Sequence, residues 1–256
     1  MILSHKILNY TNNKNNIMTI IILHGLFGNK NSLLELGYLL KQKLNYPIIL
    51  LDLRNHGQSI NDMDMRYSIM AYDVIETLHF LNINKKVILI GYSMGGKVAM
   101  YLTIFLKNMI HKIIILDIAP IAYIFSFKNI FLSFKKIHDM NITTKIQAYN
   151  IMKLYIMDYD MINILLNMFN NGQWEFNWFF IQQQYCNISG WNLIHPWLGK
   201  IMFLKGKQSN YIRIEYYKAI FTQFPSAIIY NINAGHFMYI THTDVVLRQI
   251  LIFLEQ

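Results

Sequence analysis

A single serine stands between two glycines in the segment Gly91-Tyr92-Ser93-Met94-Gly95, a spacing that could support nucleophilic chemistry. The apolar run before it predicts a buried strand, and the small residues after it predict a helix. A serine at such a turn is held in a strained backbone conformation with its hydroxyl clear of the backbone. The free N–H groups at the helix start would point at the reacting centre. We therefore predict that Ser93 is a nucleophile.

A serine hydroxyl is a weak nucleophile until a neighbouring base takes its proton. His236 lies in the segment NAGHF, directly after the last predicted strand, so its loop should open on the same sheet edge as Ser93. His111 precedes a strand and should lie at the opposite edge. The other downstream histidines fall in or beside an inserted segment (His138, His195) or near the start of the last helix (His242). We predict that His236 is the general base.

The acid that orients this base is harder to assign. Many proteins with this layout carry it after the strand at 200–206, but here the loop reads GKQSNY, with Ser209 where an aspartate is expected. Asp117 ends the preceding strand at the same sheet edge, and a triad is defined by geometry and not by sequence position. We favour Asp117, and Glu215 or another arrangement stays open.

The segment HGLFG at residues 24–28 follows the first long strand and could stabilise an oxyanion. Backbone N–H groups from such a turn and from the residue after the nucleophile commonly form this site. We expect Leu26 and Met94 to donate, with Phe27 as the alternative to Leu26. His24 is expected to fix the turn.

The loop DLRNHGQS follows the second long strand and supports two interpretations. It could be a hydrogen-bonded turn, or Arg54 or His56 could lie near an acidic group of the substrate. Arg54 is therefore one candidate for substrate contact, and three aromatic residues are the others: Tyr92, Trp178 and Tyr211.

Apolar strands alternate with helical patterns along most of the chain, which predicts an α/β fold with a mostly parallel sheet covered on both faces. Strands are expected at 19–25, 47–52, 86–91, 112–117, 200–206 and 226–232. Helices are expected at 32–44, 70–81 with Ser68 as a possible N-cap, 95–106, 211–221 and 244–254. The opening ILSHKILNY reads as an edge strand, with TNNKNN as its hairpin turn.

Residues 120–191 break this rhythm, because they are helical by pattern and rich in Phe, Tyr, Met and Trp. An insertion in an α/β sheet commonly covers the site end of the strands. We expect an α/β core formed by residues 1–119 and 192–256, with 120–191 as a helical cap subdomain.

Composition narrows the function classes. The chain of 256 residues is 54% hydrophobic and 14% charged, but no apolar run approaches the roughly 18 residues of a membrane span, and no signal-peptide layout opens it. The net charge of +9 includes no basic run longer than two, so we expect no nucleic-acid partner. The single Cys186 fits a reducing, cytoplasmic compartment, and we expect no structural zinc and no cofactor.

Taken together, the motifs resemble the α/β-hydrolase superfamily and, more closely, the small bacterial YbfF-type esterases. The likeness runs over nearly the whole chain, through HGLFG, LDLRNHGQS, GYSMGGK, DIAP, NGQWEFN, SNY and AGH. It implies an α/β-hydrolase fold with a helical cap inserted after the sixth strand, and a triad of Ser93, Asp117 and His236. It also implies hydrolysis of acyl esters or thioesters, including acyl-CoA.

Three functions remain in view. The first is a cofactor-independent serine hydrolase for esters or thioesters. The second is a carboxyl methyl-ester hydrolase acting on an acyl chain held by an acyl carrier protein, for which the basic charge would be useful. The third is a non-catalytic receptor that keeps the pocket for a small ligand.

Overall fold

A computed structural model describes residues 1–8, 18–124 and 126–256. Seven strands form one sheet in the order β1-β3-β2-β4-β5-β8-β9. Their bounds are β1 His5–Leu8, β2 Met18–Leu23, β3 Ile48–Leu51, β4 Lys86–Tyr92, β5 Ile110–Leu116, β8 Lys200–Gly206 and β9 Ala227–Ile232. All neighbouring pairs are parallel except the edge pair of β1 and β3. The predicted fold class is thereby confirmed.

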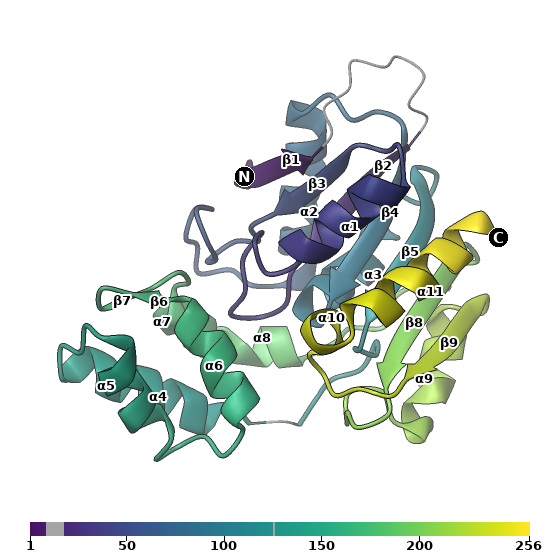
Figure 1. Ribbon diagram of the computed structural model, residues 1–256. Coiled ribbons are helices and arrows are strands. Elements are labelled where there is room, and N and C mark those ends of the chain that lie inside the picture. Colours follow the sequence, from purple (N-terminus) through teal and green to yellow (C-terminus); the bar gives the residue numbers. More distant parts are fainter. Residues whose placement is uncertain (9–17, 125) are drawn as a thin grey trace.

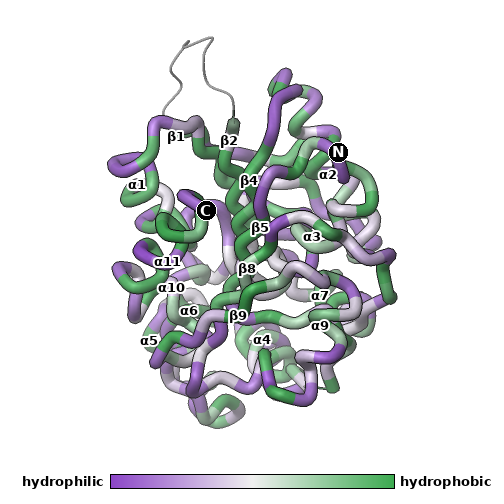
Figure 2. Tube along the Cα trace, turned by 90° about the vertical axis from the view of Figure 1, so that its right-hand side faces the viewer, coloured by the Kyte–Doolittle hydropathy of each residue, from purple (hydrophilic) through white to green (hydrophobic). Residues whose placement is uncertain are grey.

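Helices cover both faces of this sheet, as Figures 1 and 2 show. One face packs against α1 (Leu34–Lys43) and α11 (Thr243–Glu255), with the short α10 (Met238–Thr241) before it. The other packs against α2 (Tyr67–Phe80), α3 (Met94–Leu102) and α9 (Tyr217–Gln223), which follows a 3₁₀ turn at Ile214–Tyr216. In Figure 2 the hydrophobic strands run between these two layers. Two-sided burial explains why the central strands read as unbroken apolar runs.

A helical insertion separates β5 from β8. It contains α4 (Lys128–Asp139), α5 (Lys145–Met152), α6 (Tyr159–Asn167), α7 (Trp178–Gln183) and α8 (Tyr185–Ser189). A short hairpin of two-residue strands, β6 (Phe169–Asn170) and β7 (Gln173–Trp174), joins α6 to α7. Figure 1 places these helices beside the sheet, toward the carboxyl ends of its parallel strands. Along the described chain, the insertion follows β5, which is the fifth strand in sequence order.

Two local expectations were wrong. The opening strand does not form a hairpin with β2, because β1 pairs with β3 in the antiparallel sense. The expected turn residues TNNKNN lie outside the described residues. Ser68 is not the N-cap of α2, because the helix begins at Tyr67 with Arg66 as its N-cap.

Among the described residues, no helix combines the length and the apolar character needed to span a bilayer.

Candidate active site

Ser93 occupies the sharp turn between β4 and α3. Its backbone angles are φ 47° and ψ −116°, a conformation that is strained for a residue with a side chain. The glycines around it allow the chain to come close on both sides. A Cβ on Gly95 would lie 2.4 Å from the carbonyl oxygen of Leu23, and one on Gly91 would lie 2.5 Å from that of Gly95. The sequence therefore uses glycine where neighbouring backbone leaves no room for a side chain.

His236 lies in the loop between β9 and α10, and its ring is held by Asp117 at the end of β5. Nδ1 of His236 lies 2.8 Å from Oδ2 of Asp117. A carboxylate accepts hydrogen bonds, so Nδ1 carries the proton and Nε2 is left as an acceptor. The structure thus brings together the ring and the carboxylate that the sequence had placed on two different loops.

Asp117 is fully buried, yet both its oxygens are satisfied. Oδ1 accepts a hydrogen bond of 3.0 Å from the backbone N–H of Gly206, and Oδ2 also accepts one from the hydroxyl of Ser209. Its backbone has a φ of 51°, a left-handed conformation that aspartate tolerates better than most residues. Glu215, the alternative acid, is exposed and pairs with Arg213 at 3.1 Å.

Ser209 is a site residue whose role the sequence did not indicate. It occupies the position after β8 where an aspartate was expected, and its hydroxyl reaches the carboxylate of Asp117. Its oxygen in turn accepts the N–H of Tyr211 at 3.2 Å. The absence of an aspartate at this position was the available signal. A small hydrogen-bond donor there can bond to an acid that the neighbouring strand supplies.

The two candidate oxyanion donors of the HGLFG turn, the amides of Leu26 and Phe27, differ in their hydrogen bonding. The N–H of Phe27 already donates to Nε2 of His56 at 3.2 Å, so it cannot also donate to an oxyanion. The amides of Leu26 and Met94 have no acceptor among the other described residues, as expected for the first amide of a helix in the case of Met94. Leu26 and Met94 are therefore the amides that remain for an oxyanion.

His24 anchors the same turn. Its Nδ1 donates to the carbonyl of Gly25 at 2.7 Å, and its Nε2 accepts the N–H of Leu53 at 2.9 Å. Burial lowers the pKa of His24, which agrees with a neutral ring bonded at both nitrogens.

Three cavities are lined by Ser93, by His236 or by both. The first, of about 50 Å³, is lined by Ser93, Met94 and Leu26. The second, of about 40 Å³, is lined by both Ser93 and His236. The third is an open groove of about 600 Å³ on the His236 side.

Two of the four candidates for substrate contact line these cavities. Tyr211 lines all three, and its ring stacks on that of His236 with centroids 3.7 Å apart. Burial raises the pKa of Tyr211, so its hydroxyl stays neutral. Tyr92 lines the second cavity and packs between His236, at 5.0 Å, and Tyr239, at 4.4 Å. Both rings therefore also fix the orientation of His236.

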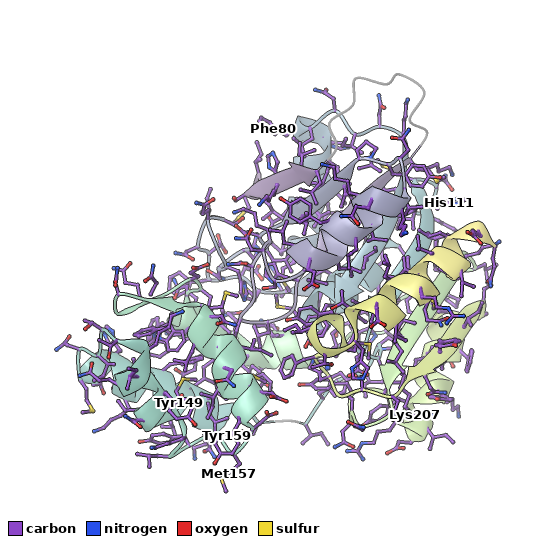
Figure 3. All side chains as sticks on the ribbon, in the orientation of Figure 1. Phe80, His111, Tyr149, Met157, Tyr159 and Lys207 are labelled. Atoms are coloured by element: carbon purple, nitrogen blue, oxygen red, sulfur yellow. The ribbon has the colours of Figure 1, made fainter. Side chains whose placement is uncertain are left out.

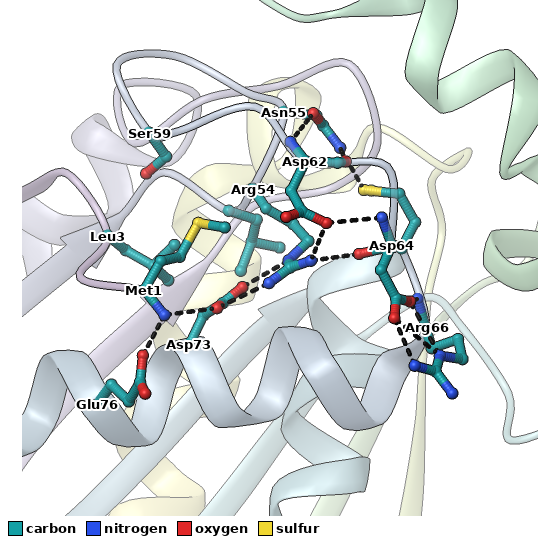
Figure 4. Close-up of polar contacts among 12 residues, drawn as sticks. Met1, Leu3, Arg54, Asn55, Ser59, Asp62, Asp64, Arg66, Asp73 and Glu76 are labelled. Atoms are coloured by element: carbon teal, nitrogen blue, oxygen red, sulfur yellow. Dashed lines mark hydrogen bonds and ion pairs between the residues drawn. The ribbon is translucent and has the colours of Figure 1, made fainter.

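The other two candidates lie outside the cavities. Trp178 begins α7 and packs against Phe134 and His138 within the insertion. Arg54 is buried in an ion-pair network, shown in Figure 4, where it makes two hydrogen bonds to Asp73 of 2.6 and 2.9 Å and one to Asp62 of 3.2 Å. Its guanidinium is used within the protein, as in the hydrogen-bonded-turn interpretation of this loop.

The remaining histidines lie apart from Ser93 or at the rim. Figure 3 shows His111 at the end of the sheet that is farthest from the insertion, whose tip carries the labelled Tyr149, Met157 and Tyr159. His138 lies in α4 of the insertion, and His195 follows α8. His242 lines only the outer groove.

Comparison with known proteins agrees with this geometry. Residues 19–144 match a family model described as the alpha/beta hydrolase fold. Esterase YbfF of Escherichia coli is 37% identical over 95% of each chain. An sn-1-specific diacylglycerol lipase, ABHD11 of Xenopus tropicalis, is 31% identical over 92% of this chain and 77% of its own length. A solved marine microorganism esterase superposes with a TM-score of 0.88 at 29% identity, covering 98% of this chain and 99% of that one.

The chain therefore belongs to the α/β hydrolase fold family. Within that family it is a relative of the bacterial esterase YbfF, which confirms the resemblance carried by the motifs.

Proposed function

We propose that this protein is a carboxylic-ester hydrolase that works through an acyl-enzyme on Ser93. The observation that carries the proposal is the 2.8 Å contact of His236 Nδ1 with the buried Asp117, beside a strained Ser93 lining the same cavity as His236. Relatives named as esterases or lipases support the same reaction class.

The proposed mechanism has two halves. His236 Nε2 takes the proton of Ser93, whose oxygen attacks the ester carbonyl, and the N–H groups of Leu26 and Met94 stabilise the oxyanion. The imidazolium, held by Asp117, then protonates the leaving alcohol. Water, deprotonated by the same ring, attacks the acyl-enzyme. The bond between the acyl carbon and the Ser93 oxygen breaks, the ring returns the proton to that oxygen, and the acid is released.

Finer assignments belong to this proposal as well. Thioesters, including acyl-CoA, undergo the same steps, and the open groove beside His236 has room for a large leaving group. We propose that residues 120–191 act as the cap over Ser93, because the insertion supplies cavity-lining residues such as Met161 and Tyr185. An exposed, unpaired Cys186 fits a cytoplasmic location.

Labelling with a fluorophosphonate, read together with hydrolysis of p-nitrophenyl acetate, tests the proposal. The wild type should be labelled and active, and Ser93→Ala should lose both properties. Ser189→Ala is the matched control, because Ser189 also lines the cavity but has no place in the mechanism. Equal labelling of wild type and Ser93→Ala would overturn the proposal, and tight ester binding without turnover would favour the receptor.

A further inference from the structure

Two of the three cavities can be assigned to the two halves of an ester. His236 must protonate the leaving group, so the leaving group lies on the side of the site that His236 lines. The groove of about 600 Å³ is lined by His236 but not by Ser93. The cavity of about 50 Å³ is lined by Ser93 and Met94 but not by His236, so it faces the acyl group.

From this asymmetry we propose that the protein selects esters of a short acyl group with a bulky alcohol or thiol, and that Lys97 closes the acyl cavity. The inference rests on the proposed function and names the substrate class of the same site.

Lys97 lies one helical turn after Ser93 in α3, and only 1% of it is exposed. Its Nζ donates to the carbonyl oxygens of Gly190 at 2.9 Å and Ser189 at 3.2 Å, where the chain leaves α8. These bonds connect α3 to the insertion beside the cavity, which both Lys97 and Ser189 line.

Aromatic rings enclose the same ammonium. Nζ lies 4.8 Å from the ring centre of Tyr123, 5.5 Å from that of Tyr67 and 5.8 Å from that of Trp191. Tyr67 also donates its hydroxyl to the carbonyl of Ile188 at 2.6 Å. The part of the cavity lining that Lys97 and Tyr67 form is therefore fixed from both the core and the insertion.

The volume sets the length of the acyl group. A space of about 50 Å³ holds roughly three or four water-sized groups, which suits acyl groups from acetyl to butanoyl. A longer chain would have to displace the ammonium from its two carbonyl acceptors, leaving charged and polar groups buried against alkyl carbon. Burial lowers the pKa of Lys97 to about 7.

The leaving-group side has no such wall. Its groove runs over loops from both core and insertion, with polar residues such as Gln208, Asn210 and Asp158 along it. A large or branched alcohol can lie there without entering the acyl cavity.

A series of p-nitrophenyl acetate, butanoate and octanoate tests the proposal with the full chain. For the wild type, kcat/KM should fall at least about tenfold from butanoate to octanoate. In Lys97→Ala the octanoate-to-butanoate ratio should rise at least about tenfold, because the cavity is opened. Lys97→Met keeps the length of the side chain without its charge, so its ratio should rise less.

Lys112 supplies the matched control. It is also buried, and its Nζ also donates to two backbone carbonyls, those of Phe253 and Leu254, but on the opposite side of the sheet. Lys112→Ala should lower stability as Lys97→Ala does and leave the ratio unchanged. The ratio is measured within one preparation, so a loss of folded protein does not alter it.

Each outcome has a separate meaning. Octanoate cleaved as fast as butanoate by the wild type, or an unchanged ratio in Lys97→Ala, would overturn the inference and leave the ester hydrolase standing. No turnover of any ester would instead remove the proposed function. On the alcohol side, the butanoate of naphthalenemethanol, an alkyl alcohol like methanol, should be cleaved with a kcat/KM at least equal to that of methyl butanoate. A loss above about tenfold for the naphthylmethyl ester would count against the open groove.

Discussion

Two polar clusters at the carboxyl end of the sheet contain the same residue types but differ in how their histidines are hydrogen-bonded. In the cluster of Asp117, His236 and Ser209, the ring of His236 is hydrogen-bonded to the other described residues at Nδ1 and not at Nε2, and its side chain stays 14% exposed beside the cavities. In the DLRNHGQS loop, His56 donates Nδ1 to the carbonyl of Arg54 at 2.8 Å and accepts the N–H of Phe27 at Nε2. A histidine bonded at both nitrogens and buried has no atom left for chemistry.

The loop cluster instead builds structure. The N–H of Gly57 donates to the carbonyl of Glu175 at 2.7 Å, and that of Asn177 to the carbonyl of Asn55 at 2.8 Å, so the loop is bonded to the insertion. Asp52 is fully buried, and its two oxygens accept the backbone N–H and the ammonium of Lys30, each at 2.6 Å. The difference teaches that the number of satisfied atoms, and not the residue type, separates the cluster proposed to react, here called the reactive cluster, from the structural one.

The largest expected effect lies in the reactive cluster. Asp117→Asn should lower kcat on p-nitrophenyl acetate about 10⁴-fold, because the amide cannot hold His236 in the same tautomer. Steady-state kinetics measure it, with Glu215→Gln as the matched control that keeps full activity. Loss of turnover in the control alone would assign the acid to Glu215.

The loop cluster should respond in stability and not in turnover. Arg54→Met leaves the buried Asp73 with only the terminal ammonium of Met1 near it, and should lower the free energy of unfolding by about 3–5 kcal/mol. Urea denaturation measures it, and kcat per folded molecule should stay within about twofold. The control is Arg66→Met, whose pair with Asp64 is exposed and worth at most about 1 kcal/mol. Equal losses in the two variants would contradict the distinction.

Low pH should also destabilise the folded protein through the loop cluster. Burial lowers the pKa of His56 to about 3, below its ordinary value of about 6.5, so the unfolded chain binds more protons than the folded one between these values. Stability therefore falls as the pH drops, by about 2 kcal/mol from pH 6.5 to 5 for this group.

Unfolding of wild type and His56→Gln at several pH values isolates that contribution. The pH slope of the variant should be shallower by about one proton. Exposed His79→Gln is the control and should keep the slope of the wild type. An unchanged slope in His56→Gln would mean that another group carries the acid sensitivity.

The smallest expected effect sharpens the reactive cluster itself. Ser209→Ala removes one of the hydrogen bonds to Asp117 and should lower kcat about tenfold, with KM nearly unchanged. Ser209→Thr keeps the hydroxyl and should recover most of the rate. Equal rates in wild type and Ser209→Ala would show that the Ser209 hydroxyl is not needed to position Asp117.

Most of the sheet could be predicted from the sequence, because strands buried on both faces leave long apolar runs with no competing period. The pairing at the sheet edge and the start of one helix were predicted less accurately. The strand β1 was expected correctly, but its partner was not, since a short edge strand can pair antiparallel with either β2 or β3 by pattern alone. The start of α2 was misplaced at Ser68, because the helix begins without a side-chain cap.

By itself, the sequence determined the elements that end at one sheet edge and the residues each of them brings there: Ser93 after β4, Asp117 after β5 and His236 after β9. That follows from local rules, since apolar runs set the strands and glycines set the turn. Only the tertiary structure decided which polar atoms remain unsatisfied. It used the amide of Phe27, the ring of His56 and the guanidinium of Arg54 internally, and it placed Lys97 in the lining of a small cavity beside Ser93. Such outcomes depend on contacts between segments far apart in the chain, and no local pattern records them.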